Sequence, residues 1–327
     1  MHSCYEDANP HSTQQETFQI QLAHGQFVQR SLDFQLDSTP AIDFRRSYLS
    51  QYLQPMAFGL GANHKYNTWL ISDGPSQLSY IDIIHEDGQR NYLRRTSSGV
   101  GFSSNVVFED RDDPLELYGA RMTWDQGHFK FLARDGSWWT YLPCGDNRCF
   151  WIGYEDANKH NLLFERDGNL ALRRLSARDG QRLQFASDTH VRIIEAVDFR
   201  GNRVSYEYDA AGCLSRVRRS DGREEVYSYD SGHHMTAVSV SLRLGQAAQT
   251  ILRTEYDSSG RAIRQVLPDG SAYAVQYVEV GKDHIREVKV TDPNGRVLDV
   301  VINDRDYTAS MKPVRFPAVA LGSDSSH

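Results

Sequence analysis

The sequence predicts an all-β protein of antiparallel hairpins, a curled sheet in which pairs of strands repeat. Three observations predict this class. Short runs of alternating apolar and polar residues recur along the chain, whereas helical periodicity is almost absent. Turn signals separate these runs: Asp198, Asp209 and Asp221 are 11 and then 12 residues apart, which leaves strands of about 5 to 8 residues. The 17 tyrosines and 14 phenylalanines also suit strands.

Length and charge limit the class of protein. The chain has 327 residues, 39% of them hydrophobic, so one large or two medium domains are expected. A formal net charge of −7 argues against a nucleic-acid binder that relies on a positive field over the whole chain. No apolar run reaches about 18 residues, so a transmembrane helix is not expected.

The first half is strand-like and less regular than the second. Residues 1–16 are polar and acidic, lack the features of a signal peptide, and are expected to be mobile. Apolar and polar residues alternate over 18–22 and 27–36, and 68–71 and 80–84 are further expected strands. These runs predict a β-domain in this half of the chain.

A soft domain boundary is predicted near residue 110. Residues 96–105 are rich in serine and glycine, and residues 108–114 form a charged loop. The boundary divides a β-domain over 17–110 from a repeat sheet over 111–302. Residues 303–327 are expected to form a second mobile tail.

Two kinds of turn signal mark the hairpins. Asp-Gly dipeptides favour the positive φ values of tight hairpin turns, and Asp-x-x-Gly is a second turn type. The Asp-Gly dipeptides begin at Asp73, Asp87, Asp135, Asp167, Asp179, Asp221 and Asp269. The Asp-x-x-Gly turns begin at Asp198, Asp209, Asp257 and Asp292.

Three Tyr-Asp units carry the repeat. Tyrosines two residues apart face the same side of a strand and can stack across a sheet, Asp opens the turn, and Gly supplies its backbone angles. The motif therefore builds a wall and does no chemistry by itself. The repeat residues are Tyr208, Asp209, Gly212, Tyr229, Asp230, Gly232, Tyr256, Asp257 and Gly260.

These units resemble the YD repeat of rearrangement-hotspot (Rhs) proteins, in which an aromatic-x-Tyr-Asp run precedes a Gly-containing turn and a short strand. The match covers 204–222, 226–238 and 254–277. Residues 25–64 are similar to the β-domain that precedes the repeats, although Ala62 stands where the family usually has Trp. The two resemblances together cover about residues 17–302.

The resemblance implies a partial β-shell. In the family, repeats curl around a toxic C-terminal domain, and bacteria deliver the shells through secretion systems. Neither the motif that ends the shell nor a toxin domain is found in this sequence. The resemblance therefore implies a non-enzymatic structural component associated with bacterial toxin delivery or the cell surface. It would be made in the cytoplasm and exported, without a signal peptide, by a secretion system.

Few residues are candidates for chemistry. Phosphate-loop, nucleophile-elbow and zinc-helix motifs are missing from the sequence, so no catalytic residue, cofactor or metal ligand is predicted. Asp110, Asp112 and Asp113 could hold calcium, but a solvated loop is the favoured interpretation. His233 and His234 could bind a metal or titrate near neutral pH, but a surface hairpin is favoured.

Four cysteines are too few for a disulfide scaffold of this size. Cys144 and Cys149 flank a short loop and could form a local disulfide. Free thiols are favoured, because the chain lacks a signal peptide. Cys4 and Cys213 add no zinc-binding pattern.

Trp138, Trp139 and Tyr141 form the one candidate ligand-stacking cluster. Neighbouring strand residues face opposite sides, so one tryptophan could be exposed and stack on a sugar ring. Packing in a core or a subunit contact is the favoured alternative. The cluster supports the runner-up function, a carbohydrate-binding or adhesion module that would contact cell-surface glycans.

A short repeat sheet should leave an unpaired edge strand, and such edges invite pairing with another chain. We expect a protein partner, a toxin or a secretion-apparatus component, or self-association near Tyr273–Tyr277 and Val288–Val290. Two further alternatives are a non-functional Rhs gene fragment and, least favoured, a β-rich hydrolase with a carboxylate pair that the sequence does not single out.

Overall fold

The computed structural model describes residues 17–86, 90–102, 105–110, 120–143, 148–279 and 285–302. Every regular element within these ranges is a β-strand, so the predicted all-β, antiparallel fold class is confirmed. The described residues fall into two compact units. Unit 1 contains residues 32–46 and 63–203, and unit 2 contains residues 17–31, 47–62 and 204–302. The predicted boundary near residue 110 stays a prediction.

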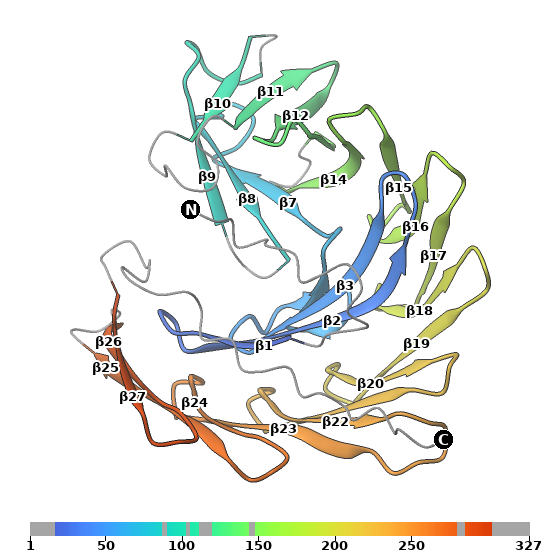
Figure 1. The fold of residues 1–327 in the computed structure, drawn as a ribbon. Helices are drawn as coiled ribbons and strands as arrows, with labels where there is room; N and C mark the ends of the chain where they lie inside the picture. Colours follow the sequence, from blue (N-terminus) through green and yellow to red (C-terminus); the bar gives the residue numbers. More distant parts are fainter. Residues whose placement is uncertain are drawn as a thin grey trace. The chain divides into compact units, whose positions relative to one another are not determined.

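A closed sheet of antiparallel strands forms the first part of unit 1 (Figure 1). Strands β7 to β14 pair in sequence order, and β14 pairs back with β7, where Phe150 lies opposite Trp69. The strands are β7 (Trp69–Ser72), β8 (Tyr80–Ile84), β9 (Arg90–Arg95), β10 (Val107–Glu109), β11 (Arg121–Asp125), β12 (His128–Leu132), β13 (Trp138–Tyr141) and β14 (Arg148–Glu155). Alternation along these strands buries one set of side chains, including Leu93, Phe108, Phe129 and Phe131.

Strand β14 belongs both to the closed sheet and to the hairpins that follow it. Residues 148–150 pair with β7, whereas 153–155 pair with β15 along the same edge. The chain then continues as an antiparallel meander through β18. Its strands are β15 (Asn161–Arg166), β16 (Leu172–Ala177), β17 (Arg182–Ser187) and β18 (Ile193–Asp198).

The parts of β2 (Gln26–Leu36) and β3 (Ile42–Leu49) that lie within residues 32–46 pack against the hairpins of unit 1. The ring centres of Phe44 and Phe185 are 4.8 Å apart. Arg46 binds both carboxylate oxygens of Asp33, and both side chains are buried. The attraction of the two charges and their hydrogen bonds offset the cost of desolvating both groups. Arg166 donates to the carbonyl oxygens of Trp151, Leu170 and Tyr66, which ties the first hairpin to neighbouring strands.

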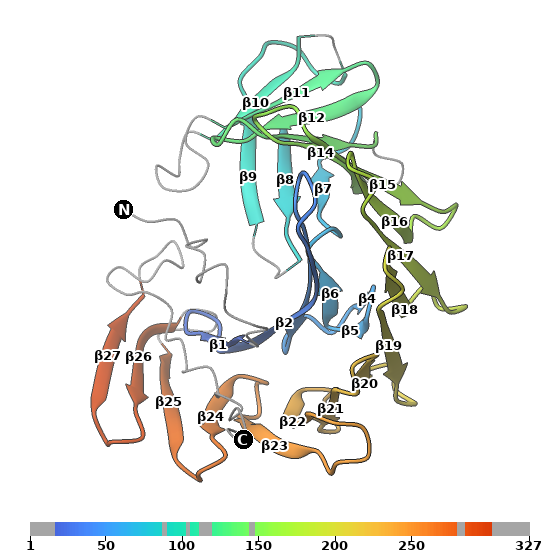
Figure 2. The same ribbon diagram turned by 45° about the vertical axis from the view of Figure 1, so that its right-hand side comes forward.

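Unit 2 contains the second meander (Figure 2). Its strands are β19 (Arg203–Tyr208), β20 (Leu214–Arg219), β21 (Glu224–Tyr229), β22 (Met235–Ser241), β23 (Gln249–Tyr256), β24 (Ala262–Val266), β25 (Ala272–Glu279), β26 (Ile285–Thr291) and β27 (Val297–Val301). The N-terminal strands are β1 (Thr17–Gln21), β2 (Gln26–Leu36), β3 (Ile42–Leu49), β4 (Pro55–Met56), β5 (Gly59–Leu60) and β6 (Ala62–His64).

The two turn signals build one and the same hairpin turn. In the 209–213 turn, Asp209 bonds Cys213 through backbone groups, and the fourth residue, Gly212, has a φ of +89°. The 219–223 turn has the same bonds, with Gly222 at +92°. Aspartate stands first in one turn and third in the other, and in both its Oδ1 accepts the N–H of the fifth residue. Asp-Gly here therefore closes the same five-residue turn.

Two sequence predictions about glycine are wrong. In the 167–171 turn the left-handed residue is Leu170, with a φ of +62°, because Asp167 stands first in the turn. In the 230–234 turn it is His233, with a φ of +67°, because Asp230 stands first there too. The fourth position of the turn takes the left-handed conformation whichever residue occupies it.

The edge of the second meander also differs from the prediction. Val288 on β26 lies opposite Tyr277 on β25 and opposite Val300 on β27, so β26 is an inner strand. Tyr273–Tyr277 lie on β25, which pairs with β24 and β26, so the expected edge at Tyr273–Tyr277 and Val288–Val290 is wrong. Among the described strands of unit 2, β27 pairs with β26 alone, so β27 is the outer strand of this meander.

Candidate functional site: the turn edge of unit 2

Three hairpin turns of unit 2 lie at the same end of their strands, because they alternate along an antiparallel meander. We call the turns 209–213, 230–234 and 257–261 the turn edge. Residues 17–31 and 47–62 of unit 2 form an N-terminal strap that contacts each of these turns in succession. The turn edge and the strap together are the candidate site, an interaction surface.

The strap approaches the first turn through its backbone. Leu60 N–H donates to the carbonyl oxygen of Gly212 at 3.2 Å. Gly59 has a φ of +83°, and a Cβ built there would stand 2.1 Å from the same carbonyl oxygen. Only glycine fits at this position, both by conformation and by space.

Tyr48 holds the second turn, and Gly25 holds the third. The Tyr48 hydroxyl accepts the N–H of Met235 at 2.9 Å and donates to the carbonyl oxygen of His233 at 3.3 Å. Burial raises the pKa of Tyr48 far above its ordinary value, so the hydroxyl keeps its proton. At the third turn, Ala262 N–H donates to Gly25 O at 2.8 Å.

The tyrosines of the repeat join one turn to the next. Tyr229 donates to Leu214 O at 2.7 Å, Tyr256 to Met235 O at 2.8 Å, and Tyr277 to Ala262 O at 2.6 Å. Each acceptor lies five residues after the aspartate of the preceding Tyr-Asp turn. The hydroxyls therefore form a ladder beneath the turn edge, and burial raises their pKa values.

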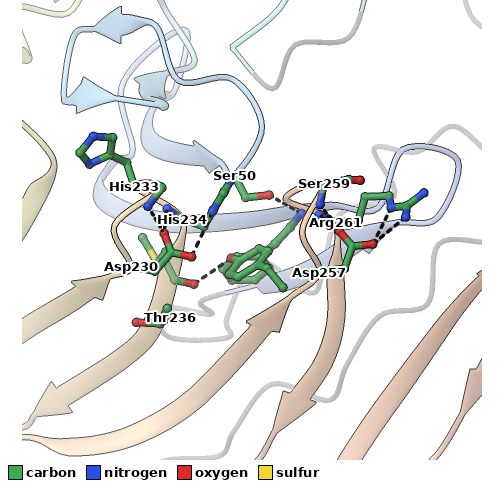
Figure 3. A network of polar contacts seen from close by, with 12 residues as sticks. Ser50, Asp230, His233, His234, Thr236, Asp257, Ser259 and Arg261 are labelled. Atoms are coloured by element: carbon green, nitrogen blue, oxygen red, sulfur yellow. Dashed lines mark hydrogen bonds and ion pairs between the residues drawn. The ribbon is translucent and has the colours of Figure 1, made fainter. Parts of the chain in front are cut away.

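The aspartates close the turns from within (Figure 3). Oδ1 of Asp257 accepts the N–H groups of Ser259 and Arg261, and Oδ2 binds the Arg261 guanidinium at 2.7 Å. Asp230 has the same arrangement, with Nδ1 of His234 3.1 Å from Oδ2. Partial burial raises the pKa of both carboxyls, but these hydrogen bonds outweigh it and leave both pKa values lowered.

A buried polar network lies between the strap and the meander. Gln29 Nε2 is 3.4 Å from the Tyr227 hydroxyl, which donates to Glu225. Arg219 binds the other carboxylate oxygen of Glu225 at 2.9 Å, and both side chains are buried. A buried polar network is stabilising only when its members are paired. This network therefore favours one position of the strap on the meander.

The aromatic cluster has a packing role for two of its three members. Tyr141 is 0% exposed, so the prediction that its ring stacks on a ligand is wrong: the closed sheet encloses it. The Trp139 ring stacks on Trp151 with centres 4.8 Å apart, and its Nε1–H donates to Ser137. Trp138 is half-buried, and its role in ligand binding stays a prediction.

The remaining candidate residues fall partly outside the described ranges. Asp112, Asp113 and Cys144 lie outside them. Cys149 is disulfide-bonded, so the preference for a free thiol at this position is wrong, whereas Cys213 is a buried free thiol whose pKa burial raises to about 11. Among the described residues, no three His, Cys, Asp or Glu side chains gather as a metal site, and no helix is long and apolar enough to cross a membrane.

The tyrosines of the repeat lie on strands and its aspartates and glycines lie in turns, whereas the docking of strap residues on these turns was not predicted. Gly25 and Gly59 lie in the segment that resembles the family's β-domain. Tyr48 lies in the same segment, but nothing local predicts that it bonds a turn 187 residues away.

The hairpins, the aspartate turns and the tyrosine ladder define a protein of antiparallel β-hairpin repeats. Residues 19–93 match the family model described as a domain of unknown function, DUF6531. The protein "Probable deoxyribonuclease RhsA" of Dickeya dadantii (strain 3937) is 22% identical over 296 residues, covering 87% of this chain and 19% of the relative. This chain thus spans about a fifth of that relative's length. The resemblance to Rhs YD-repeat proteins is confirmed.

Solved structures of toxin complexes show distant similarity. The crystal structure of TcdB2-TccC3 has a TM-score of 0.36 and 12% identity, over 86% of this chain and 20% of that chain. The Tc holotoxin pore of Photorhabdus luminescens has a TM-score of 0.35 and 12% identity, over 84% of this chain and 19% of that chain.

Proposed function

We propose that this chain is a non-enzymatic scaffold associated with bacterial toxin delivery, and that it acts by binding a protein partner. The similarity to RhsA carries the proposal, because it extends over 87% of the chain and so includes both the strap and the hairpins. A toxin or a component of the secretion apparatus is the proposed partner, and export by that apparatus is the proposed route.

The outer strand of unit 2 is the proposed contact. Val297 and Val301 on β27 are both 58% exposed, whereas Val300 faces the buried side. Among the described strands of unit 2, β27 is paired along one edge only. Its other edge can offer backbone groups, and its exposed valines apolar contacts, to a strand of another chain. The inner strands of the meander lack this possibility, since both of their edges are paired.

Co-purification from the native cell tests the proposal. Tagged wild-type chain is compared with a Val297→Lys/Val301→Lys variant and with Leu163→Lys, a control at a 61% exposed position on β15. Wild type and control should recover the same toxin or secretion component, and the double variant should lose it. Recovery of neither component by wild type contradicts the scaffold, and retention by the double variant contradicts the β27 contact.

The name of the relative calls for a separate test of activity. Purified chain is incubated with plasmid DNA and divalent cations, and we expect the DNA to stay intact. Cleavage that co-elutes with the chain through successive columns would overturn the non-enzymatic part of the proposal and leave the partner-binding part standing.

A further inference from the structure

One position of the aspartate turns differs in chemistry from turn to turn. In several turns that begin with aspartate, the side chain of the fifth residue binds Oδ2 of that aspartate. It is arginine in two turns, Arg192 on Asp188 and Arg261 on Asp257, both at 2.7 Å. It is asparagine in another, where Asn202 donates to Asp198 at 2.7 Å. It is histidine in two turns, His160 on Asp156 at 2.9 Å and His234 on Asp230 at 3.1 Å, and of these two His234 lies in the turn edge. Arginine is always charged, asparagine never is, and histidine changes charge between about pH 5 and 8.

His234 stands between the two backbone groups that bind the strap. The carbonyl of His233 and the N–H of Met235, on either side of it, both bond the Tyr48 hydroxyl. The His234 ring stacks on Tyr256 with centres 4.9 Å apart, and a Cβ on Gly260 would meet its Nε2 at 2.7 Å. The imidazole is thus fixed in place, with Nδ1 toward Asp230 (Figure 3).

We propose that the 230–234 turn is a proton-responsive contact, in which protonation of His234 tightens the hold of the turn on Tyr48 of the strap. A neutral imidazole keeps one Nδ1–H···Oδ2 hydrogen bond, as Asn202 does in its turn. A protonated imidazole adds the attraction of opposite charges, as Arg261 does in its turn. The inference does not depend on the proposed function.

The other charged and titratable groups around His234 keep their charge over this range. Asp230 has a lowered pKa and stays ionised. Tyr48 and Tyr256 have raised pKa values and stay neutral. Asp257 and Arg261, from the adjacent turn, stay paired as ions. The remaining imidazole, His233, turns away from Asp230 in Figure 3.

Amide exchange of Met235 reports directly on the contact, and Ala262 is its matched reference. Each is the residue after the fifth position of its turn, and each donates its N–H to the strap. The ratio of their protection factors, corrected for intrinsic exchange, is measured at about pH 5.5 and pH 8 in the full chain. We expect the wild-type ratio to fall about two- to fivefold at the higher pH, the range for a partly exposed ion pair.

Two variants fix the turn in either charge state. His234→Arg copies the 257–261 turn and should keep the ratio high at both pH values. His234→Asn copies the 198–202 turn and should keep it low at both. Wild type should match the arginine variant in acid and the asparagine variant in base. A wild-type ratio that does not change with pH, or one that changes equally in both variants, overturns the proposal.

Discussion

The Tyr48 hydroxyl and the Met235 amide, 187 residues apart in the sequence, form a buried hydrogen bond of 2.9 Å. Tyr48 comes from the strap and Met235 begins β22, so this bond joins the N-terminal segment to the repeat. Because the hydroxyl also donates to His233 O, one side chain satisfies two backbone groups of the same turn. Tyr48 is therefore the point at which the strap recognises the hairpin.

Removing that hydroxyl should destabilise unit 2. In Tyr48→Phe the Met235 N–H is left buried without its acceptor, and we expect a loss of about 1–3 kcal/mol in the free energy of unfolding. Urea denaturation followed by amide hydrogen exchange of unit 2 measures it, because all five tryptophans lie in unit 1. Tyr52→Phe, on the same strap, serves as the control and should change stability by less than about 0.5 kcal/mol. A loss of less than about 0.5 kcal/mol in Tyr48→Phe as well would show that Tyr48 acts through its ring alone.

Close approach of two backbones makes Gly59 the most sensitive glycine of the strap. Gly59→Ala sets a Cβ 2.1 Å from Gly212 O in addition to a strained positive φ, so we expect a loss of about 2–3 kcal/mol or more. Gly245 has a similar φ of +79° with nothing within 4 Å of its Cβ position. Gly245→Ala should thus lose only about 1 kcal/mol. If both variants lose the same amount, the strap does not lie against the 209–213 turn.

The hairpins could be predicted from the sequence because their determinants are local. An aspartate caps backbone groups two and four residues on, and a left-handed residue completes the turn, so a five-residue window holds the information. The same window misled the assignment of Gly232. That segment has glycine third and histidine fourth, and the fourth position takes the positive φ regardless.

Pairing between residues far apart in the chain could not be predicted from the sequence. The closed sheet depends on the pairing of Phe150 with Trp69, and no local sequence pattern around either residue predicts this pairing. The strap depends on Gly25, Tyr48 and Gly59 reaching turns some 150 to 240 residues away, and their role exists only once the meander has formed. Aromatic composition likewise could not tell an enclosed ring such as Tyr141 from an exposed one.

Backbone strain at Val191 predicts a stabilising substitution. Val191 is the fourth residue of the 188–192 turn, with a φ of +66°, which β-branched residues rarely adopt. Val191→Gly relieves strain of about 1–2 kcal/mol, and the entropy of glycine offsets part of it, so we expect a net gain of about 0.5–1 kcal/mol. The matched variant Val297→Gly replaces another exposed valine within a strand and should lose stability. A loss in both would mean that Val191 has contacts that outweigh its strain.

Acid should destabilise the turns, and the direction of this effect follows from the pKa values of the aspartates. The pKa values of Asp188, Asp230 and Asp257 are lowered in the folded chain, because the hydrogen bonds and cations of their turns outweigh the opposing effect of burial. The unfolded chain therefore binds more protons below its own aspartate pKa of about 3.9. The stabilisation is fully present above that pH and is lost as pH falls through the folded pKa values. Denaturation curves from pH 7 to pH 2 should show unfolding become easier below about pH 4.

Asp257→Asn isolates the contribution of one turn to this acid response. The amide oxygen still accepts the backbone N–H groups of Ser259 and Arg261, but the ion pair with Arg261 is gone. The variant should be less stable than wild type at neutral pH and approach it in acid, because protonation removes the same charge from the wild-type turn. Asp299→Asn, on β27 and outside any turn, is the comparison and should run parallel to wild type. An Asp257→Asn curve that also runs parallel to wild type would mean that the turn carboxylates do not set the acid stability of this fold.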